Sequence, residues 1–288
     1  MTAYNRQEYI AEAIKSVLAS DYVNFELIIV DDASTDNTLA IARSFAENEP
    51  RIKVYRNDTN LGDYPNRNKA ASLAKGKYIK YVDSDDMIYP HSLAVMVQAM
   101  EKFPGAGFGF CDVRNEPVDA LPKQYSGKEA LQIHFLKGGF LLAGPCNTII
   151  NREFFNSIEG FDTTRFIGDY ATWLKMCLHQ PVVIFKPALM WLRSHQGQEN
   201  DVGKLAYYHL NYTLHRDFIS SNNKIFTKEE QNKILYNYRV LLGRRIYQRL
   251  LKWYGLKKTI GVIQEAGESL SIFLWAFLPM KKLTTNDR

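Results

Sequence analysis

Three carboxylates lie within four residues of this chain, at Asp83, Asp85 and Asp86. Like charges that share a cleft raise one another's pKa values, which costs stability. A bound Mg²⁺ or Mn²⁺ would remove that cost, because hard cations prefer oxygen ligands and keep waters and substrate phosphates around them. The same residues could form a solvated acidic turn that caps the helix after Pro90. Taken alone, the cluster leaves both interpretations open.

A second acidic pair, Asp31 and Asp32, directly follows the apolar run 25–30. Acid pairs at strand ends also occur in phosphoacceptor receiver domains, but those domains are much shorter than this chain and their later residues are spaced differently. An EF-hand is excluded, because the segment 31–36 lacks the glycine that a calcium loop requires.

The segments around these acids alternate between helical and strand periodicity, which predicts an α/β fold with helices on both faces of an open, largely parallel sheet. Ligands of such sheets bind beyond the carboxyl ends of the strands. Both acidic clusters are therefore expected in one crevice, although about fifty residues separate them. The predicted helices are 8–18, 36–46, 64–74, 91–102 and 170–178, and the predicted strands are 25–30, 52–55, 78–82, 107–111, 146–151 and 181–185.

The chain is predicted to divide into a catalytic domain, residues 1–203, and a helical C-terminal region, residues 204–288. Within the first, residues 1–113 form the half with regular alternation, and residues 114–203 form a less regular half. An apolar fraction of 46% supports a sizeable core and excludes a disordered chain.

Composition also limits the compartment. Three isolated cysteines without a CxxC pair exclude a disulfide framework and a zinc site, and they favour a reducing cytosol. No apolar run reaches the roughly 18 residues of a membrane span. The first residues lack the basic and apolar stretches of a signal peptide, so a cytoplasmic location is predicted.

Positive charge is concentrated at the end of the chain. Residues 224–288 hold 13 Lys and Arg against 5 Asp and Glu, whereas the whole chain is only +5. The basic amphipathic helix 229–253 and the apolar run 269–278 could dock on the inner membrane face, near a lipid-linked acceptor. Alternatively, they pack on the core or on a second copy of the chain in a homo-oligomer. No nucleic-acid reading motif accompanies the basic residues.

Several short motifs, including the two acidic clusters, follow one another in a fixed order over about residues 1–200. They are Thr2–Asn5, Val30–Asp36, Asn60–Gly62 with Arg67 and Asn68, Asp83–Asp86, Gly160–Asp162, Gly168–Tyr170 with Trp173, and Arg193–His195. The whole set resembles the family 2 glycosyltransferases. That resemblance implies a GT-A fold with a Rossmann-like open mixed sheet, and it implies inversion of the anomeric centre.

The resemblance implies which residues bind the donor. Asp32 matches the carboxylate that accepts a hydrogen bond from the base, which favours the N3–H of uracil or thymine and hence a UDP- or dTDP-sugar. Arg67 matches the basic residue on the nucleotide side, and Asp83, Ser84 and Asp85 match the DxD motif. Asp83 would reach the nucleotide and the metal, Ser84 the nucleotide and Asp85 the metal. Thr2, Ala3 and Tyr4 match the nucleotide-binding turn.

The resemblance also implies the catalytic residues of a metal-dependent hexosyltransferase. Asp169 matches the general base, and the positive end of its helix would lower its pKa and keep it ionised. His195 matches a histidine near the metal and diphosphate, where Mn²⁺ or Mg²⁺ offsets the charge of the leaving group. Asp112 and Trp173 are candidates for contacts with the sugar or the acceptor. The structural alternatives are a helix cap for Asp169, a structural role for His195, a strand end at Asp112 and core packing for Trp173.

One base and in-line attack predict inversion, and the absence of a Gln-x-x-Arg-Trp signature predicts transfer of one sugar per encounter. The acceptor would be a surface glycan or glycolipid. A catalytically silent sugar-nucleotide-binding or partner subunit is the alternative, whereas a nucleotidyltransferase would need a glycine-rich phosphate loop that is absent. Family members usually carry an apolar strand before the position of Thr2, so we hypothesise that the natural product starts upstream of Met1 or that this chain is a shortened form of it.

Overall fold

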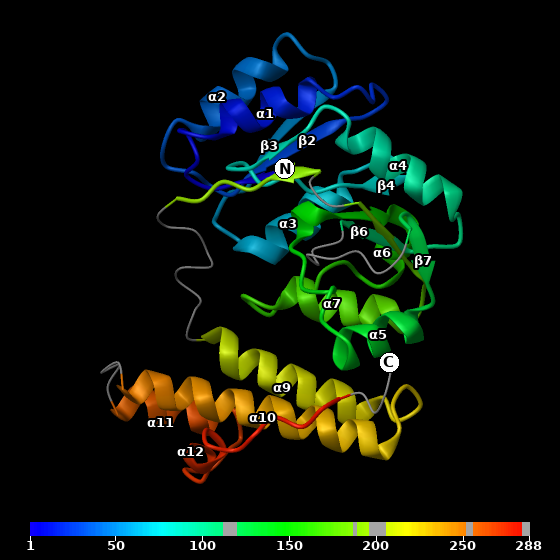
Figure 1. Ribbon diagram of the computed structural model, residues 1–288. Coiled ribbons are helices and arrows are strands. Elements are labelled where there is room, and N and C mark those ends of the chain that lie inside the picture. The colour runs from blue at the N-terminus through cyan, green and yellow to red at the C-terminus, as the bar shows by residue number, and fades with distance from the viewer. Residues whose placement is uncertain (112–119, 187–188, 196–205, 252–255, 284–288) are drawn as a thin grey trace. The chain divides into compact units, whose positions relative to one another are not determined.

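The computed structural model describes residues 1–111, 120–186, 189–195, 206–251 and 256–283. It divides into two compact units (Figure 1). The first contains residues 1–130 and 140–194, and the second contains residues 131–139 and 195–288. Asp112 and the predicted boundary between residues 203 and 204 lie outside the described residues.

Three parallel strands form the first sheet, in the order β1 (Thr2–Ala3), β2 (Leu27–Asp31) and β3 (Ile52–Arg56). Every residue of β2 is buried, as expected for a strand that is apolar on both faces. Successive side chains of β2 point alternately to the two faces of the sheet, as in any strand.

Helices cover both faces of this sheet (Figure 1). On one face Leu27 and Ile29 pack in a cluster with α1 (Ile10–Leu18) and α2 (Thr38–Ala46). On the other face Ile28 and Val30 pack against Ala70 of α3 (Asp63–Ser72). The helix α3 thereby lies directly beneath the strand that ends at the first acidic pair.

The strand β1 takes a central place in the fold although it has only two residues. Thr2 pairs with Val30 of β2 on one side and forms a parallel bridge to Asp83 on the other. This bridge brings the two acidic clusters together at one edge, which confirms their predicted convergence.

The second sheet is mixed rather than parallel, in the order β4-β8-β6-β9-β7. Only β6 and β9 run parallel, and the other three pairings are antiparallel. The predicted strand 78–82 is shorter than expected, because β4 ends at Ile79. The strands are β4 (Tyr78–Ile79), β6 (Phe108–Cys111), β7 (Lys123–Tyr125), β8 (Thr148–Asn151) and β9 (Val182–Phe185), and β5 (Met87–Ile88) pairs separately with β10 (Met190–Trp191).

Helices alternate with these strands along the chain, and two of them matter most for the site. Met96 and Met100 of α4 pack against residues of β6, β8 and β9. The helix α7 carries the predicted base in its first turn. The helices are α4 (Ser92–Lys102), α5 (Gly127–Leu136), α6 (Arg152–Ser157) and α7 (Gly168–Cys177), and the 3₁₀ helix η1 (Pro145–Asn147) precedes β8.

The described part of the second unit beyond His195 is helical, with an apolar core built from Tyr212, Leu242, Ile246, Ile263 and Ile272. Among the residues described, none of the helices combines the length and apolarity needed to cross a bilayer. The helices are α9 (Ala206–Ser221), α10 (Lys228–Leu251), α11 (Leu256–Glu265) and α12 (Ile272–Trp275).

Candidate active site

Two turns are tied together beyond the carboxyl ends of β1 and β2. The backbone N–H of Asn5 donates to Oγ of Ser34 at 2.9 Å, and Oδ1 of Asn5 accepts from the N–H of Thr35 at 2.9 Å. Asn5 and Ala33 both have positive φ angles, 51° and 61°, so the backbone turns sharply after β1 and after β2. Tyr4, the residue before Asn5, has 44% of its surface exposed. Its ring is thus open to a ligand, whereas Ala3 is buried and Thr2 forms sheet pairs.

Asp32 anchors the loop that leads into α3. Its Oδ1 accepts from Nδ2 of Asn57 at 2.6 Å and from the N–H of Leu61 at 2.9 Å, and its Oδ2 accepts from the N–H of Gly62 at 3.0 Å. Gly62 has a φ of 86°, a conformation that favours glycine. A carboxylate offers about four acceptor positions. One acceptor position therefore remains on this buried carboxylate, and the predicted base contact stays a prediction.

The neighbouring Asp31 is fully buried. Its Oδ2 accepts from the N–H of Ser34 at 3.0 Å, and Nε of Arg56 lies 3.9 Å away. Within the described residues its Oδ1 has no hydrogen-bond partner. An unsatisfied buried carboxylate oxygen is costly and calls for a donor.

Arg67 holds the first carboxylate of the DxD motif. Its Nη1 lies 2.7 Å from Oδ1 of Asp83, and its Nε donates to Oδ1 of Asp63 at 2.7 Å. Burial alone would raise the pKa of Asp83, but the guanidinium of Arg67, together with the Cys146 thiol and Lys80, lowers it. Because the guanidinium is engaged by two carboxylates, its predicted contact with the nucleotide stays a prediction.

The other two carboxylates of the turn also have partners. Nε of Arg6 donates to Oδ2 of Asp85 at 2.8 Å, and the backbone N–H of Arg193 donates to Oδ1 of Asp86 at 2.9 Å. Burial raises the pKa of Asp86 to about 6. Arginines and backbone donors thus offset part of the repulsion within the turn, so the turn is not freely solvated. Ser84 is buried between these acids.

One group in the first unit has a ligand set that fits a divalent cation. A carboxylate oxygen of Asp83, a carboxylate oxygen of Asp86 and Sγ of Cys146 all lie within 4.8 Å of one another. Burial raises the pKa of the Cys146 thiol far above its usual value, so the thiol is neutral and the carboxylates are the natural ligands of Mn²⁺ or Mg²⁺. The sequence predicted Asp83, Asp85 and His195 as metal ligands, and this group shares Asp83 with that prediction and adds Asp86, from the same acidic run, and Cys146 as further candidates.

His195 was predicted beside this metal. It falls in the second unit, and the two units are not placed relative to each other. Its metal contact therefore stays a prediction, as does that of Asp85.

Asp169 lies in the first turn of α7 and is partly exposed. Its Oδ1 accepts from the phenol O–H of Tyr64 at 2.9 Å and from the N–H of Tyr170 at 2.7 Å. The predicted lowering of its pKa is wrong, because burial outweighs these hydrogen bonds and raises the pKa to about 6. A carboxyl with that pKa is still ionised at neutral pH and can accept a proton.

Trp173 is a core residue. It is fully buried, its indole N–H donates to the carbonyl oxygen of Ala143 at 2.9 Å, and its ring packs against Phe108, Phe110 and Phe161. This corrects the predicted contact with sugar or acceptor, since no face of the ring is available to a ligand.

The family-model comparison decides the identity. The model of glycosyl transferase family 2 matches residues 1–159, more than half of the chain. The chain belongs to glycosyl transferase family 2. It is accordingly a glycosyltransferase, as its motifs predicted.

Relatives of this glycosyltransferase extend the similarity along most of the chain. The glycosyltransferase GlyG of Streptococcus pneumoniae is 25% identical over 273 residues, which are 87% of this chain and 85% of that protein. The GalNAc(5)-diNAcBac-PP-undecaprenol beta-1,3-glucosyltransferase of Campylobacter jejuni is 27% identical over 178 residues, 58% of this chain and 57% of that one.

Solved structures show that the fold of this glycosyltransferase is of the predicted GT-A type. TarS of S. aureus, in complex with UDP-GlcNAc, superposes with a TM-score of 0.67 at 19% identity and covers 92% of this chain and 78% of its own. The mannosyltransferase PcManGT of Pyrobaculum calidifontis, in complex with GDP-Man and Mn²⁺, gives a TM-score of 0.59 at 18% identity, with 95% of this chain and 76% of its own covered.

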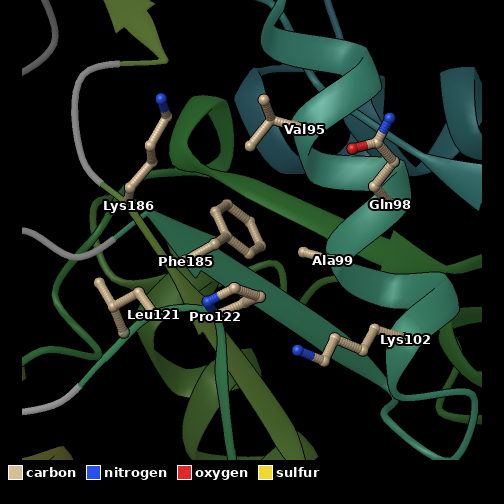
Figure 2. Close-up of a pocket in the computed structure, with 8 residues that line it drawn as sticks. All are labelled: Val95, Gln98, Ala99, Lys102, Leu121, Pro122, Phe185 and Lys186. Carbon is tan, nitrogen blue, oxygen red and sulfur yellow. The ribbon is translucent and has the colours of Figure 1, made fainter.

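A separate cavity of about 290 Å³ lies beside α4 (Figure 2). Phe185, at the end of β9, and Leu121 and Pro122 face Val95 and Ala99 of α4 across it, and Lys102 and Lys186 stand at its rim. The described lining of this cavity includes none of the residues predicted for catalysis.

Proposed function

We propose that this glycosyltransferase moves one sugar from a UDP- or dTDP-sugar to an acceptor hydroxyl and inverts the anomeric centre. The observation that carries the proposal is the state of Asp169. Its carboxylate is held by the O–H of Tyr64 and the N–H of Tyr170, and its pKa of about 6 leaves it ionised at neutral pH. A base with that pKa is well matched to proton transfer near neutrality.

The proposed reaction is a single displacement. Asp169 accepts the proton of the acceptor hydroxyl while the hydroxyl oxygen bonds to the anomeric carbon, and the bond from that carbon to the nucleoside diphosphate breaks. The acceptor hydroxyl alone is a weak acid, so removal of its proton as the bond forms lowers the barrier. Attack from the side opposite the leaving group inverts the configuration.

Binding of the donor base is proposed at the turns of Tyr4 and Asp32. The exposed ring of Tyr4 offers a stacking surface, and the remaining acceptor position of Asp32 suits the N3–H of a pyrimidine. The complex of TarS with UDP-GlcNAc supports a uridine donor, whereas the complex of PcManGT with GDP-Man makes the base a point for experiment.

Mn²⁺ or Mg²⁺ would be held at the acidic turn, where Asp83 is common to the DxD motif and to the group with Asp86 and Cys146. Bound there, a divalent cation would neutralise the charge that develops on the leaving diphosphate. The Mn²⁺ complex of PcManGT supports this choice of metal. The protein's own contribution is to hold Asp83 in place through Arg67.

The acceptor is proposed to be a surface glycan or a lipid-linked glycan, reached at the inner face of the membrane. In the second unit Leu270, Leu274 and Phe277 are 61%, 70% and 69% exposed, and the exposed Lys281 and Lys282 follow them. Exposed apolar side chains beside lysines suit an anionic bilayer. A second copy of the chain would oppose the same positive charges if this surface paired with itself. The undecaprenol-linked acceptor in the name of the Campylobacter relative supports a lipid-linked acceptor.

Donor hydrolysis and transfer test the proposal directly. The purified protein is incubated with Mn²⁺ and with UDP-, dTDP- and GDP-sugars, release of the nucleoside diphosphate is measured, and the product anomer is assigned by NMR. We expect release from uridine or thymidine donors and an inverted product. A retained configuration, or turnover that survives in Asp169→Asn, would reject the proposal. Asp162→Asn is the matched control, because Asp162 is an exposed carboxylate on the same loop.

A further inference from the structure

The helix α3 lies against the loop that leads into α7. The proposed base, Asp169, is in the first turn of α7. Tyr64 is buried, and its ring packs so closely on Gly168 that a Cβ added there would lie 2.7 Å from Cδ2 of Tyr64. The same ring packs on Phe161 with 5.7 Å between centroids. The Tyr64 ring therefore has almost no freedom to move, and its hydroxyl has a fixed position.

A second residue of α3 fixes the start of the same loop. Nδ2 of Asn68 donates to the carbonyl oxygen of Phe161 at 2.9 Å, and Oδ1 of Asn68 accepts from the N–H of Phe161 at 2.8 Å. Gly160 has a φ of 78°, and a Cβ there would lie 2.6 Å from Oδ1 of Asn68. The loop between Gly160 and Asp169 is thus attached to α3 at both ends.

The same helix holds the donor side of the site through Arg67, which pairs with Asp83. Tyr64 and Arg67 are one helical turn apart, so one rigid element contacts both the DxD motif and Asp169. Groups that must react together need such fixed relative positions.

We infer that Tyr64 is a positioning residue for the base: its phenol O–H donates to Oδ1 of Asp169 and holds the carboxylate in the orientation that receives the acceptor's proton. The inference rests on the proposed function, because it presumes that Asp169 is the base. It adds a residue outside the sequence motifs, since Tyr64 does not stand in any of them.

The electrostatic consequence can be stated from the groups that face Asp169. Burial raises its pKa, the O–H of Tyr64 and the N–H of Tyr170 lower it, and Arg67 lowers it while Asp63 raises it. The pKa of Tyr64 itself is raised by burial, so its hydroxyl remains a donor throughout the working range of pH. Removing that donor leaves the carboxylate less stabilised, and the pKa of Asp169 must rise.

The test is the pH profile of kcat in Tyr64→Phe, which keeps the ring and its packing. We expect kcat at pH 7 to fall about tenfold or more, because a hydrogen bond to a charged group is lost. The acid limb of the profile should move about one pH unit higher, and KM for the donor should change less than twofold. Tyr81→Phe is the matched control. Tyr81 is a buried tyrosine whose hydroxyl donates to the carbonyl oxygen of Arg67 at 3.0 Å, so its loss should leave the acid limb in place.

The outcomes separate this inference from the proposed function. If Asp169→Asn is inactive and Tyr64→Phe has the wild-type acid limb, the positioning role is rejected and the base assignment stands. If Asp169→Asn remains active, the base assignment fails first. A Tyr64→Phe protein with lower stability but an unchanged limb would show that the tyrosine is only a packing residue, which also overturns the inference.

Discussion

Nη1 of Arg67 lies 2.7 Å from Oδ1 of Asp83, where Arg67 is buried and the side chain of Asp83 is 28% exposed. The pair lowers the electrostatic cost of an acidic turn at the end of a strand. Desolvation makes a buried carboxylate costly, and a nearby guanidinium lowers that cost. The same pairing makes the turn depend on one residue of α3.

Removal of Arg67 should therefore destabilise the protein. We expect Arg67→Met to lower the free energy of unfolding by about 2 kcal/mol, because it leaves the partly buried carboxylate of Asp83 without its partner. Denaturation in urea measures the change. Arg51→Met is the control, since Arg51 pairs with Glu49 at the surface and its loss should change stability far less. Equal effects of the two variants would contradict the prediction.

Asp169 should reduce stability at neutral pH. Its folded pKa of about 6 lies above its ordinary value of 3.8, so between these values the folded state binds more protons and stability falls as pH rises. Asp169→Asn removes this cost. Its free energy of unfolding should exceed that of the wild type by about 1–3 kcal/mol at pH 7.5 and by less at pH 5. Urea titrations at the two pH values measure it, and a gain that is equal at both would count against the pKa.

Binding of a divalent cation should depend on Asp83. In the presence of UDP, Mn²⁺ should raise the melting temperature of the wild type, and Asp83→Asn should remove most of that increase. Asp58→Asn, on an exposed loop residue, should keep it. Asp85→Asn and Asp86→Asn are then compared. The carboxylate whose loss also removes the increase in melting temperature is the second ligand of the cation. An unchanged increase in Asp83→Asn would exclude this site.

Two glycines offer a test of the packing between α3 and the loop before α7. A Cβ at Gly168 would lie 2.1 Å from the carbonyl oxygen of Asp162, so Gly168→Ala should lower stability by at least about 2 kcal/mol. At Gly261, inside α11, no described atom lies within 4 Å of an added Cβ. There alanine should stabilise the helix by about 0.5–1 kcal/mol. Thermal unfolding of both variants measures the difference, and a Gly168→Ala protein as stable as the wild type would contradict the close packing.

The exposed apolar surface of the second unit should bind anionic vesicles. Leu274→Ser and Phe277→Ser together should weaken co-sedimentation with phosphatidylglycerol liposomes by about tenfold or more, because each buried side chain is worth about 1.5–3 kcal/mol. Val23→Ser is the control, since Val23 is 72% exposed in the first unit. Unchanged sedimentation of the double variant would reject the membrane surface, and a change of oligomeric state in its place would indicate a second copy of the chain.

The sequence by itself determined the order of the elements and the kinds of residue at their ends. Hydrophobic periodicity is local, so β2 and the helices around it could be predicted within a few residues. The meeting of the two acidic clusters at one edge followed from the predicted order of strands and helices. The family could be recognised for the same reason, since its motifs are short and ordered along the chain.

Only the tertiary structure decided how those residues are paired and charged. Tyr64 and Asp169 are 105 positions apart, and no local sequence pattern predicts their hydrogen bond. The pKa of Asp169 was misjudged from sequence because the helix N-terminus is visible in the pattern whereas desolvation is not. For Trp173 the sequence left a ligand contact and core packing as alternatives, and the fold decided for the core. Burial depends on everything that packs around a side chain, and that is set by the fold as a whole.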